Sequence, residues 1–194
     1  PHPVDEVDDE VVLAALRRLI PEAEAKGVTL LVETNGVYAD TNRLRKLLDE
    51  VGSDAVAALW DLHHPYRFAD EKPETTVQNL GAYIKYVHIK DSVVENGVVK
   101  YKMMGEGDLP LDDMMLALRS INYEGYISLE WVKRWASELS DAGVVFPHYL
   151  NYMERYLEKH ITRGRLFDNN AKTGKYVWEK DILIDLTFPQ VLDR

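Results

Sequence analysis

The sequence contains no cysteine among its 194 residues. This absence excludes disulfide bonds, thiolate metal ligands and a cysteine nucleophile. It is also typical of proteins that work in a reducing compartment. We therefore expect a cytoplasmic protein.

Long apolar runs and an excess of basic residues are missing as well. No run approaches the roughly 20 residues that cross a bilayer, and the acidic start "PHPVDEVDDE" differs from a signal peptide. Acidic residues outnumber basic ones by 33 to 23, which gives a net charge of −10 and disfavours a nucleic-acid partner. The first residue is Pro rather than Met, so we expect a processed chain or a segment of a longer one.

The sequence does contain a regular alternation of helical and strand patterns. Short apolar runs predict strands, and the segments between them carry helical caps such as Asp40 and Gly52. Asn96-Gly97 between two apolar runs predicts a hairpin turn. Strands that alternate with helices favour an α/β fold with a parallel sheet. The expected strands are 28–33, 55–61, 86–91 and 125–130, and the expected helices are 5–27, 40–52, 75–85, 109–121 and 146–161.

Each predicted strand places a carboxylate or an imidazole at or near its carboxyl end. The residues are Glu33, Asp61, His88 and Glu130, separated by 28, 27 and 42 residues. Parallel β/α units bring these ends together, and their oxygen-rich donor set suits Mn²⁺, Mg²⁺ or Co²⁺ better than a soft metal, with Zn²⁺ as a further option. Taken singly, each has a plainer interpretation, because strand-end carboxylates often cap the next turn and a histidine in an apolar strand is often part of the core.

The segments "LVET", "WDLHH", "YVHIKDS", "GEGDLP" and "GYISLEW" together resemble the second half of the xylose-isomerase-like TIM barrels. The resemblance covers about residues 5–160 and implies four parallel β/α units from a (β/α)8 barrel. In the epimerase branch of that family, Glu, Asp, His and Glu hold one divalent metal. Those positions are matched by the four strand-end residues Glu33, Asp61, His88 and Glu130.

The resemblance also implies a reaction. A divalent-metal-dependent isomerase or epimerase would convert a small sugar or sugar phosphate through an enediolate, with Glu33 and Glu130 moving the proton. His64 would contact the substrate or a second metal, and His63 would be a structural or loop residue. Lys90 should share a strand face with His88 and could neutralise developing charge, or it could simply pair with Asp91 or Glu130.

The sequence departs from the motifs of two branches of the family, and each departure disfavours the activity of that branch. The endonuclease IV branch has a further Asp-x-His pair after its seventh-strand histidine, and no such pair occurs in "NGVVKYKMMGEG". A zinc nuclease is therefore disfavoured. The ketose 3-epimerases have an arginine six residues after the metal-binding histidine, where this sequence has Val94, which counts against a free-ketose substrate.

The largest departure is length, because a complete barrel needs about 250 residues. The chain could be a fragment that lacks its N-terminal half and could be inactive alone, a half that closes by homodimerisation, or a stand-alone half barrel. Two other functions stay open: a non-catalytic barrel-half module of a multidomain protein, and a metal-dependent dehydratase or lyase. We expect the half barrel over 1–162 and an extension over 163–194, whose end resembles the start of an adenylate-forming ligase or forms a plain amphipathic helix.

Overall fold

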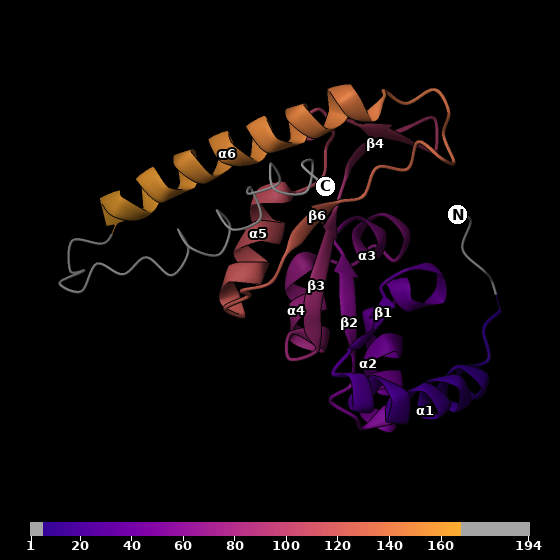
Figure 1. Ribbon diagram of the computed structural model, residues 1–194. Helices are drawn as coiled ribbons and strands as arrows, with labels where there is room; N and C mark the ends of the chain where they lie inside the picture. The colour runs from indigo at the N-terminus through magenta and orange to yellow at the C-terminus, as the bar shows by residue number, and fades with distance from the viewer. Residues whose placement is uncertain (1–5, 168–194) are drawn as a thin grey trace. The chain divides into compact units, whose positions relative to one another are not determined.

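The computed structural model describes residues 6–167, with side chains up to Glu158 (Figure 1). The chain divides into two compact units. The first combines Pro1–Ile89 with Pro110–Ser128, and the second combines Lys90–Leu109 with Leu129–Arg194.

The first unit is built on a sheet whose strand order is β1-β2-β3-β6. Strand β2 pairs in parallel with both β1 and β3, and the backbone N–H of Val87 donates to the carbonyl of Tyr126 at 3.2 Å beside β6. The predicted α/β fold with a parallel sheet is therefore confirmed. The bounds are Leu30–Glu33 for β1, Val56–Asp61 for β2, Ile84–Ile89 for β3 and Ile127–Leu129 for β6.

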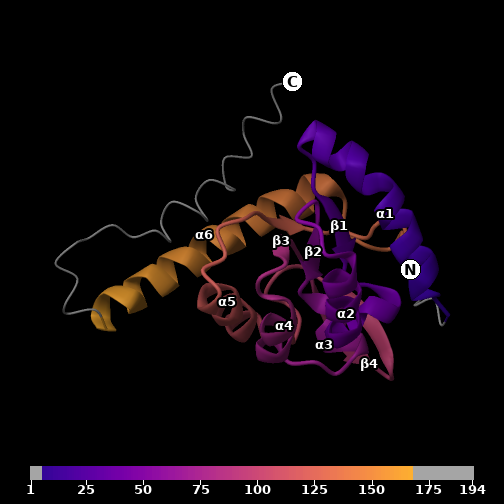
Figure 2. The same ribbon diagram turned by 90° about the horizontal axis from the view of Figure 1, so that it is seen from below.

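Helices pack beside one another in the first unit. Helix α1 contacts α2, α2 contacts α4, and α4 contacts α5 (Figure 2). Helix α2 shows why the sequence sets its ends: the Asp40 side chain accepts from the N–H groups of Asn42 and Arg43, and Gly52 adopts a left-handed φ of 60°. The bounds are Asp9–Lys26 for α1, Gly36–Ala39 for the 3-10 helix η1, Thr41–Val51 for α2, His63–Phe68 for α3, Pro73–Leu80 for α4 and Leu111–Ser120 for α5.

The core of this unit holds apolar side chains from both strands and helices. Strand β2 is buried along most of its length, as expected for a strand covered on both faces. Fully or almost fully buried side chains include Leu44, Trp60, Leu80, Val87 and Met114. Burial of this apolar surface is the main driving force that holds helices and sheet together.

Several predicted bounds differ from the observed ones, above all where α4 meets β3, and neither η1 nor α3 was predicted. The helix expected over 75–85 ends at Leu80, because Ile84 and Lys85 already belong to β3, where buried and exposed residues begin to alternate. Strand β3 accordingly starts two residues before the expected position 86 and ends at Ile89. Helix α3 went unpredicted because its six residues are too few to show a helical period.

An ion pair fastens α1 to α2. Arg43 Nε donates to Asp9 Oδ2 at 3.0 Å, and the hydroxyl of Tyr38 donates to Asp9 Oδ1 at 2.9 Å. The guanidinium of Arg43 lowers the pKa of the Asp9 carboxyl below its ordinary value. Burial, together with the neighbouring Asp9 carboxylate, raises the pKa of the Tyr38 hydroxyl. The carboxylate is therefore the form that the fold favours.

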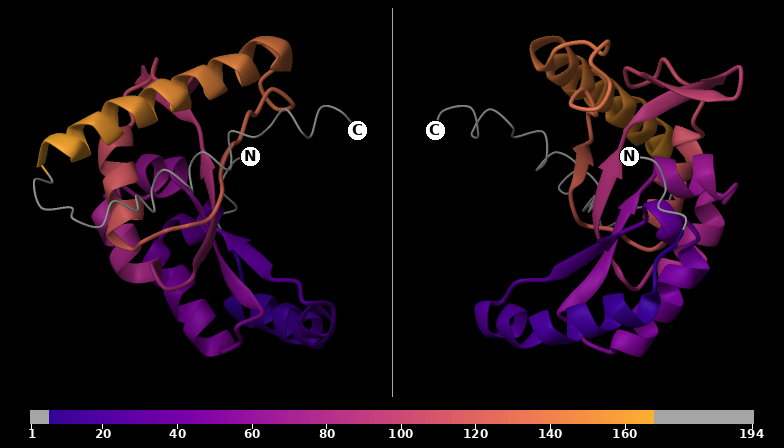
Figure 3. Two further views of the ribbon diagram at one scale, coloured as in Figure 1. Left: turned by 60° about the vertical axis from the view of Figure 1, so that its left-hand side comes forward. Right: turned by 90° about the vertical axis from the view of Figure 1, so that its right-hand side faces the viewer.

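The second unit contains a hairpin and a long helix. Strands β4, Asp91–Glu95, and β5, Val98–Lys102, pair antiparallel (Figure 3). Asn96 and Gly97 have φ values of 52° and 76°, so they form the predicted two-residue turn. Helix α6 runs over Ala142–Phe167 and is longer than the predicted 146–161.

The proposed domain boundary after residue 162 falls inside α6 and stays a prediction. Residues 168–194 lie outside the described part of the chain, and so does the segment that resembles an adenylate-forming ligase. Among the described residues, no helix is both long and apolar enough to cross a membrane.

Candidate metal centre

Three predicted ligands meet at the carboxyl ends of β1, β2 and β3. Glu33 and Asp61 are the last residues of their strands, and His88 is the last but one of its strand. Asp61 lies opposite His88, and Glu33 lies opposite Leu59, two residues before Asp61, so strand alternation places all three on one face. Each offers a ligand atom within 4.8 Å of the others. His88 Nδ1 lies 3.3 Å from Glu33 Oε1.

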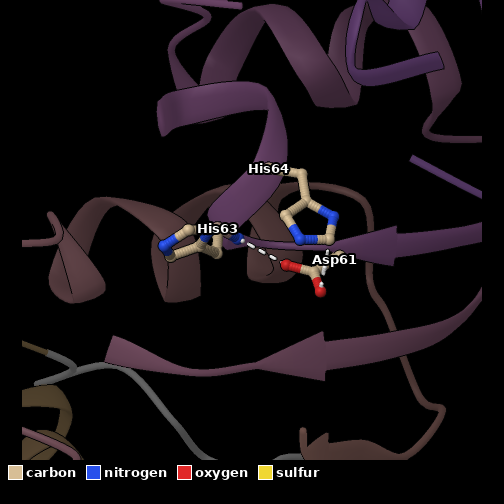
Figure 4. Close-up of side chains that lie close together, drawn as sticks. All are labelled: Asp61, His63 and His64. Atoms are coloured by element: carbon tan, nitrogen blue, oxygen red, sulfur yellow. Dashed lines mark hydrogen bonds and ion pairs between the residues drawn. The ribbon is translucent and has the colours of Figure 1, made fainter. Parts of the chain in front are cut away.

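The three side chains differ in exposure. Asp61 is fully buried, whereas the Glu33 and His88 side chains are 29% and 24% exposed. Asp61 Oδ1 accepts a hydrogen bond from the backbone N–H of His63 at 2.9 Å (Figure 4). Asp61 is thus the buried member of the cluster, and the side chains of Glu33 and His88 remain accessible to a solute.

The paired histidines lie directly behind Asp61, in the first turn of α3. His64 Nδ1 is 3.7 Å from Asp61 Oδ2, and the two imidazole rings pack edge to face at 5.5 Å between centroids. Both histidines are buried, and each ring also packs against Phe68. His63 therefore belongs to the packed interior and is helical rather than part of a loop. His64 lies beside the predicted ligand Asp61, and its contact with substrate stays a prediction.

The remaining predicted residues, Glu130 and Lys90, lie in the second unit. Glu130 directly follows β6, and its Oε2 forms an ion pair with Lys90 Nζ. Lys90 is 1% exposed. The expected pairing of Lys90 with Glu130 is therefore present. Its other possible role, neutralising charge that develops on a substrate, stays a prediction. Lys90 was expected to share a strand face with His88. It lies one residue beyond the end of β3, however, so strand alternation does not determine where its side chain points.

The Asp91 carboxylate accepts hydrogen bonds from Ser92 and from a nearby loop. Its Oδ2 accepts from the N–H groups of Gly105 at 3.0 Å and Gly107 at 2.9 Å, and its Oδ1 accepts from Ser92 N–H at 2.8 Å. A Cβ at Gly107 would lie 1.9 Å from Asp91 Oδ1, so only glycine permits this approach. The "GEG" of the recognised motif therefore wraps a buried carboxylate.

The donor set of the first unit fits a hard or borderline divalent cation. Two carboxylates and one imidazole are typical ligands of Mn²⁺, Mg²⁺ and Co²⁺, and also of Zn²⁺. The carboxylates of Glu33 and Asp61 would repel each other in such proximity without a positive charge between them. The three residues can therefore hold a metal ion, and the role of Glu130 as a fourth ligand stays a prediction.

Sequence reasoning did not single out two polar residues after β1. The hydroxyl of Thr34 bonds to the main chain of Asp61, and Asn35 Nδ2 lies 3.5 Å from Glu33 Oε2. Thr34 is fully buried. The available signal was its position directly after a strand that ends in a candidate ligand.

Residues 1–148 match the family described as xylose isomerase-like TIM barrel. The match covers most of the chain, so the protein belongs to this family. A fructoselysine 3-epimerase of Escherichia coli O157:H7 is 28% identical over 128 residues, which are 63% of this chain and 46% of the relative. The chain thus spans about half the length of the curated relatives that it matches.

Solved structures support the same fold. An L-ribulose 3-epimerase superposes with a TM-score of 0.69 at 18% identity, covering 87% of this chain and 62% of that one. A D-allulose 3-epimerase from Methylomonas sp. gives a TM-score of 0.65 at 20% identity, covering 80% of this chain and 58% of that one. Identities this low bear on the fold alone. They agree with the predicted half barrel.

Proposed function

We propose that this chain carries the metal centre of a divalent-metal-dependent isomerase or epimerase that acts on a small sugar or sugar phosphate. The observation that carries the proposal is the cluster formed by Glu33, Asp61 and His88, whose ligand atoms lie within 4.8 Å of one another. Membership of the xylose-isomerase-like family and the likeness to sugar epimerases support it.

In this proposal Glu33, Asp61 and His88 bind Mn²⁺, Mg²⁺ or Co²⁺, and Glu130 completes the set. The bound ion would supply Lewis acidity, which makes a C–H bond beside a sugar carbonyl more acidic. Glu33 and His88 are partly exposed, which supports the proposal that a substrate can reach the bound ion. Asp61, which is fully buried, would hold the ion from the protein interior.

The protein's own part of the chemistry is proton movement. Isomerisation moves a proton between adjacent carbons, and epimerisation returns it to the opposite face, so both need a general base within reach, a role that a carboxylate can fill. Glu33 and Glu130 are the proposed acid–base pair. Lys90, paired with Glu130, orients that carboxylate, while Asn35 does the same for Glu33. His64, next to Asp61, is proposed to face the substrate.

Calorimetric titration of the 194-residue chain with Mn²⁺ tests the centre. We expect about one ion per chain, and loss of binding in Asp61→Asn. Asparagine keeps an acceptor for the His63 N–H but removes the charge. The matched control is Asp54→Asn, an exposed aspartate that precedes the opposite end of β2. A wild-type chain that binds no divalent ion overturns the proposal.

The reaction is tested by incubating the chain with ketoses and ketose phosphates in D₂O and recording proton NMR spectra. Proton abstraction beside the carbonyl exchanges that hydrogen for deuterium. We expect exchange that requires Mn²⁺ and is lost in Glu33→Gln and in Glu130→Gln. Exchange that persists in both variants would exclude the proposed acid–base pair.

A further inference from the structure

Thr34 makes an unusual double contact with the main chain of Asp61. Its Oγ1 donates to the carbonyl oxygen of Asp61 at 3.2 Å and accepts from the N–H of Asp61 at 2.9 Å. Both residues are fully buried. The Thr34 side chain therefore forms hydrogen bonds with both the N–H and the carbonyl of Asp61, which lies 27 positions further along the chain.

The hydroxyl replaces a bond that the sheet itself would otherwise make. Thr34 N–H donates to the carbonyl of Leu59 at 3.0 Å, and a regular parallel ladder would continue from Asp61 N–H to the carbonyl of Thr34. The chain instead turns away, because Asn35 N–H bonds to the carbonyl of Glu33 at 2.7 Å and the Asn35 side chain caps η1. The side chain of Thr34 thus extends the pairing of β1 and β2 by one residue.

We propose that Thr34 is a positioning residue for the metal centre, an inference that rests on the proposed function. By holding both the N–H and the carbonyl of Asp61, it fixes the backbone angles that set the direction of the Asp61 carboxylate. The second anchor of that carboxylate is the N–H of His63. Groups that orient a ligand from behind are commonly needed for full metal affinity.

Thr34→Val tests the role of the hydroxyl at nearly constant volume. Without it, two buried backbone groups of Asp61 lose their bond to the Thr34 hydroxyl, and the backbone that directs the carboxylate is held less firmly. We expect Mn²⁺ affinity to fall about 10- to 100-fold, the range typical of lost outer contacts. Thr34→Ser keeps the hydroxyl and should restore binding to within about twofold of wild type.

Thr41→Val is the matched control for a general loss of stability. Thr41 is also fully buried, and its hydroxyl also has two partners: it donates to Glu71 Oε1 at 2.6 Å and accepts from Asn79 Nδ2 at 2.8 Å. Both valine variants should unfold at lower temperature than wild type. Only Thr34→Val should weaken Mn²⁺ binding and alter the visible spectrum of bound Co²⁺, which reports ligand geometry.

Hydrogen exchange provides a reading that needs no metal. The Asp61 amide should exchange faster in Thr34→Val than in wild type or in Thr41→Val, because its acceptor is gone. If Thr34→Val does not fold, Thr34→Cys takes its place, since a thiol is only a weak donor and acceptor. It should then bind Mn²⁺ more weakly than Thr34→Ser does.

The outcomes separate the two proposals. Equal Mn²⁺ affinity in wild type, Thr34→Ser and Thr34→Val would overturn the positioning role and leave the metal centre in place. Equal losses in Thr34→Val and Thr41→Val would also overturn it, because the effect would then follow stability alone. A wild-type chain without Mn²⁺ binding removes the proposed function, and the inference with it.

Discussion

His88 Nδ1 lies 3.3 Å from Glu33 Oε1, although β3 and β1 are not neighbours in the sheet. Strand β2 lies between them, and two inter-strand steps amount to about 10 Å. Only long side chains that lean toward the middle can close that distance. The shorter side chain of Asp61 extends from β2, and its ligand atom lies within 4.8 Å of theirs. The two longer side chains thus come from the flanking strands β1 and β3, and the shortest comes from β2, which lies between those strands.

This arrangement predicts that shortening a flanking ligand is as harmful as removing its charge. In Glu33→Asp the carboxylate is retained but withdrawn by one methylene group, toward β1. We expect Mn²⁺ affinity to fall at least about tenfold, or about 1.4 kcal/mol, when measured by calorimetry. Glu22→Asp, on the exposed surface of α1, is the control and should bind as wild type does. Unchanged affinity in Glu33→Asp would exclude Glu33 as a ligand.

Much of this cluster could be predicted because strand ends leave a clear mark in the sequence. Apolar runs that stop at Glu33 and Asp61 fix both the strand and the polar residue that ends it. Parallel pairing then requires those ends to meet. The hairpin was equally clear, since Asn96 and Gly97 tolerate the positive φ values that a tight turn requires.

Other features depend on contacts that no local pattern encodes. Helix α3 has only six residues, too few to show a helical period, and its N-cap residue Leu62 makes no side-chain hydrogen bond that would mark its start. The start of β3 is set by pairing of Ile84 with Ala58 rather than by helix propensity in the preceding segment. The partner of Thr34 lies on another strand, so its double contact could be found only in the folded chain.

The helix layer gives a second prediction, about stability. Leu118 and Leu116 lie two residues apart on α5, yet Leu118 is 2% exposed and Leu116 is 58% exposed. Leu118→Ala should lower the free energy of unfolding by about 2–5 kcal/mol, because it leaves a cavity in the core. Leu116→Ala should change it by no more than about 0.5 kcal/mol. Urea unfolding of both variants measures the contrast, and similar losses would contradict the observed packing.

A third prediction concerns the loop that wraps Asp91. Asp91→Asn replaces one of the two accepting oxygens by an amide that points donors at donors, because Oδ1 and Oδ2 together accept three backbone N–H groups. We expect a loss of about 1–3 kcal/mol and faster hydrogen exchange at Gly105 and Gly107. Glu106→Gln, an exposed carboxylate of the same loop, should leave that exchange unchanged. Protection that survives in Asp91→Asn would show that the carboxylate does not hold the loop.

The contact between Asp9 and Arg43 gives a prediction about pH. Because the Arg43 guanidinium lowers the pKa of Asp9 below its ordinary 3.8, the folded state binds this proton less readily than the unfolded chain. Its contribution is therefore fully present above that ordinary value and is lost as the pH falls through the lower pKa of the folded state. The two side chains are 38% and 34% exposed, so solvent screens the pair and we expect only about 0.5–1 kcal/mol.

Urea unfolding of wild type and Asp9→Asn at pH 7 and at about pH 2.5 measures this contribution. The variant should be less stable than wild type at neutral pH, and the difference should shrink in acid, where Asp9 becomes protonated. An Arg43→Gln background provides the control, because without the guanidinium the cost of Asp9→Asn at neutral pH should fall. An equal cost at both pH values, or an equal cost in both backgrounds, would mean that Asp9 acts through its Tyr38 hydrogen bond and not through charge.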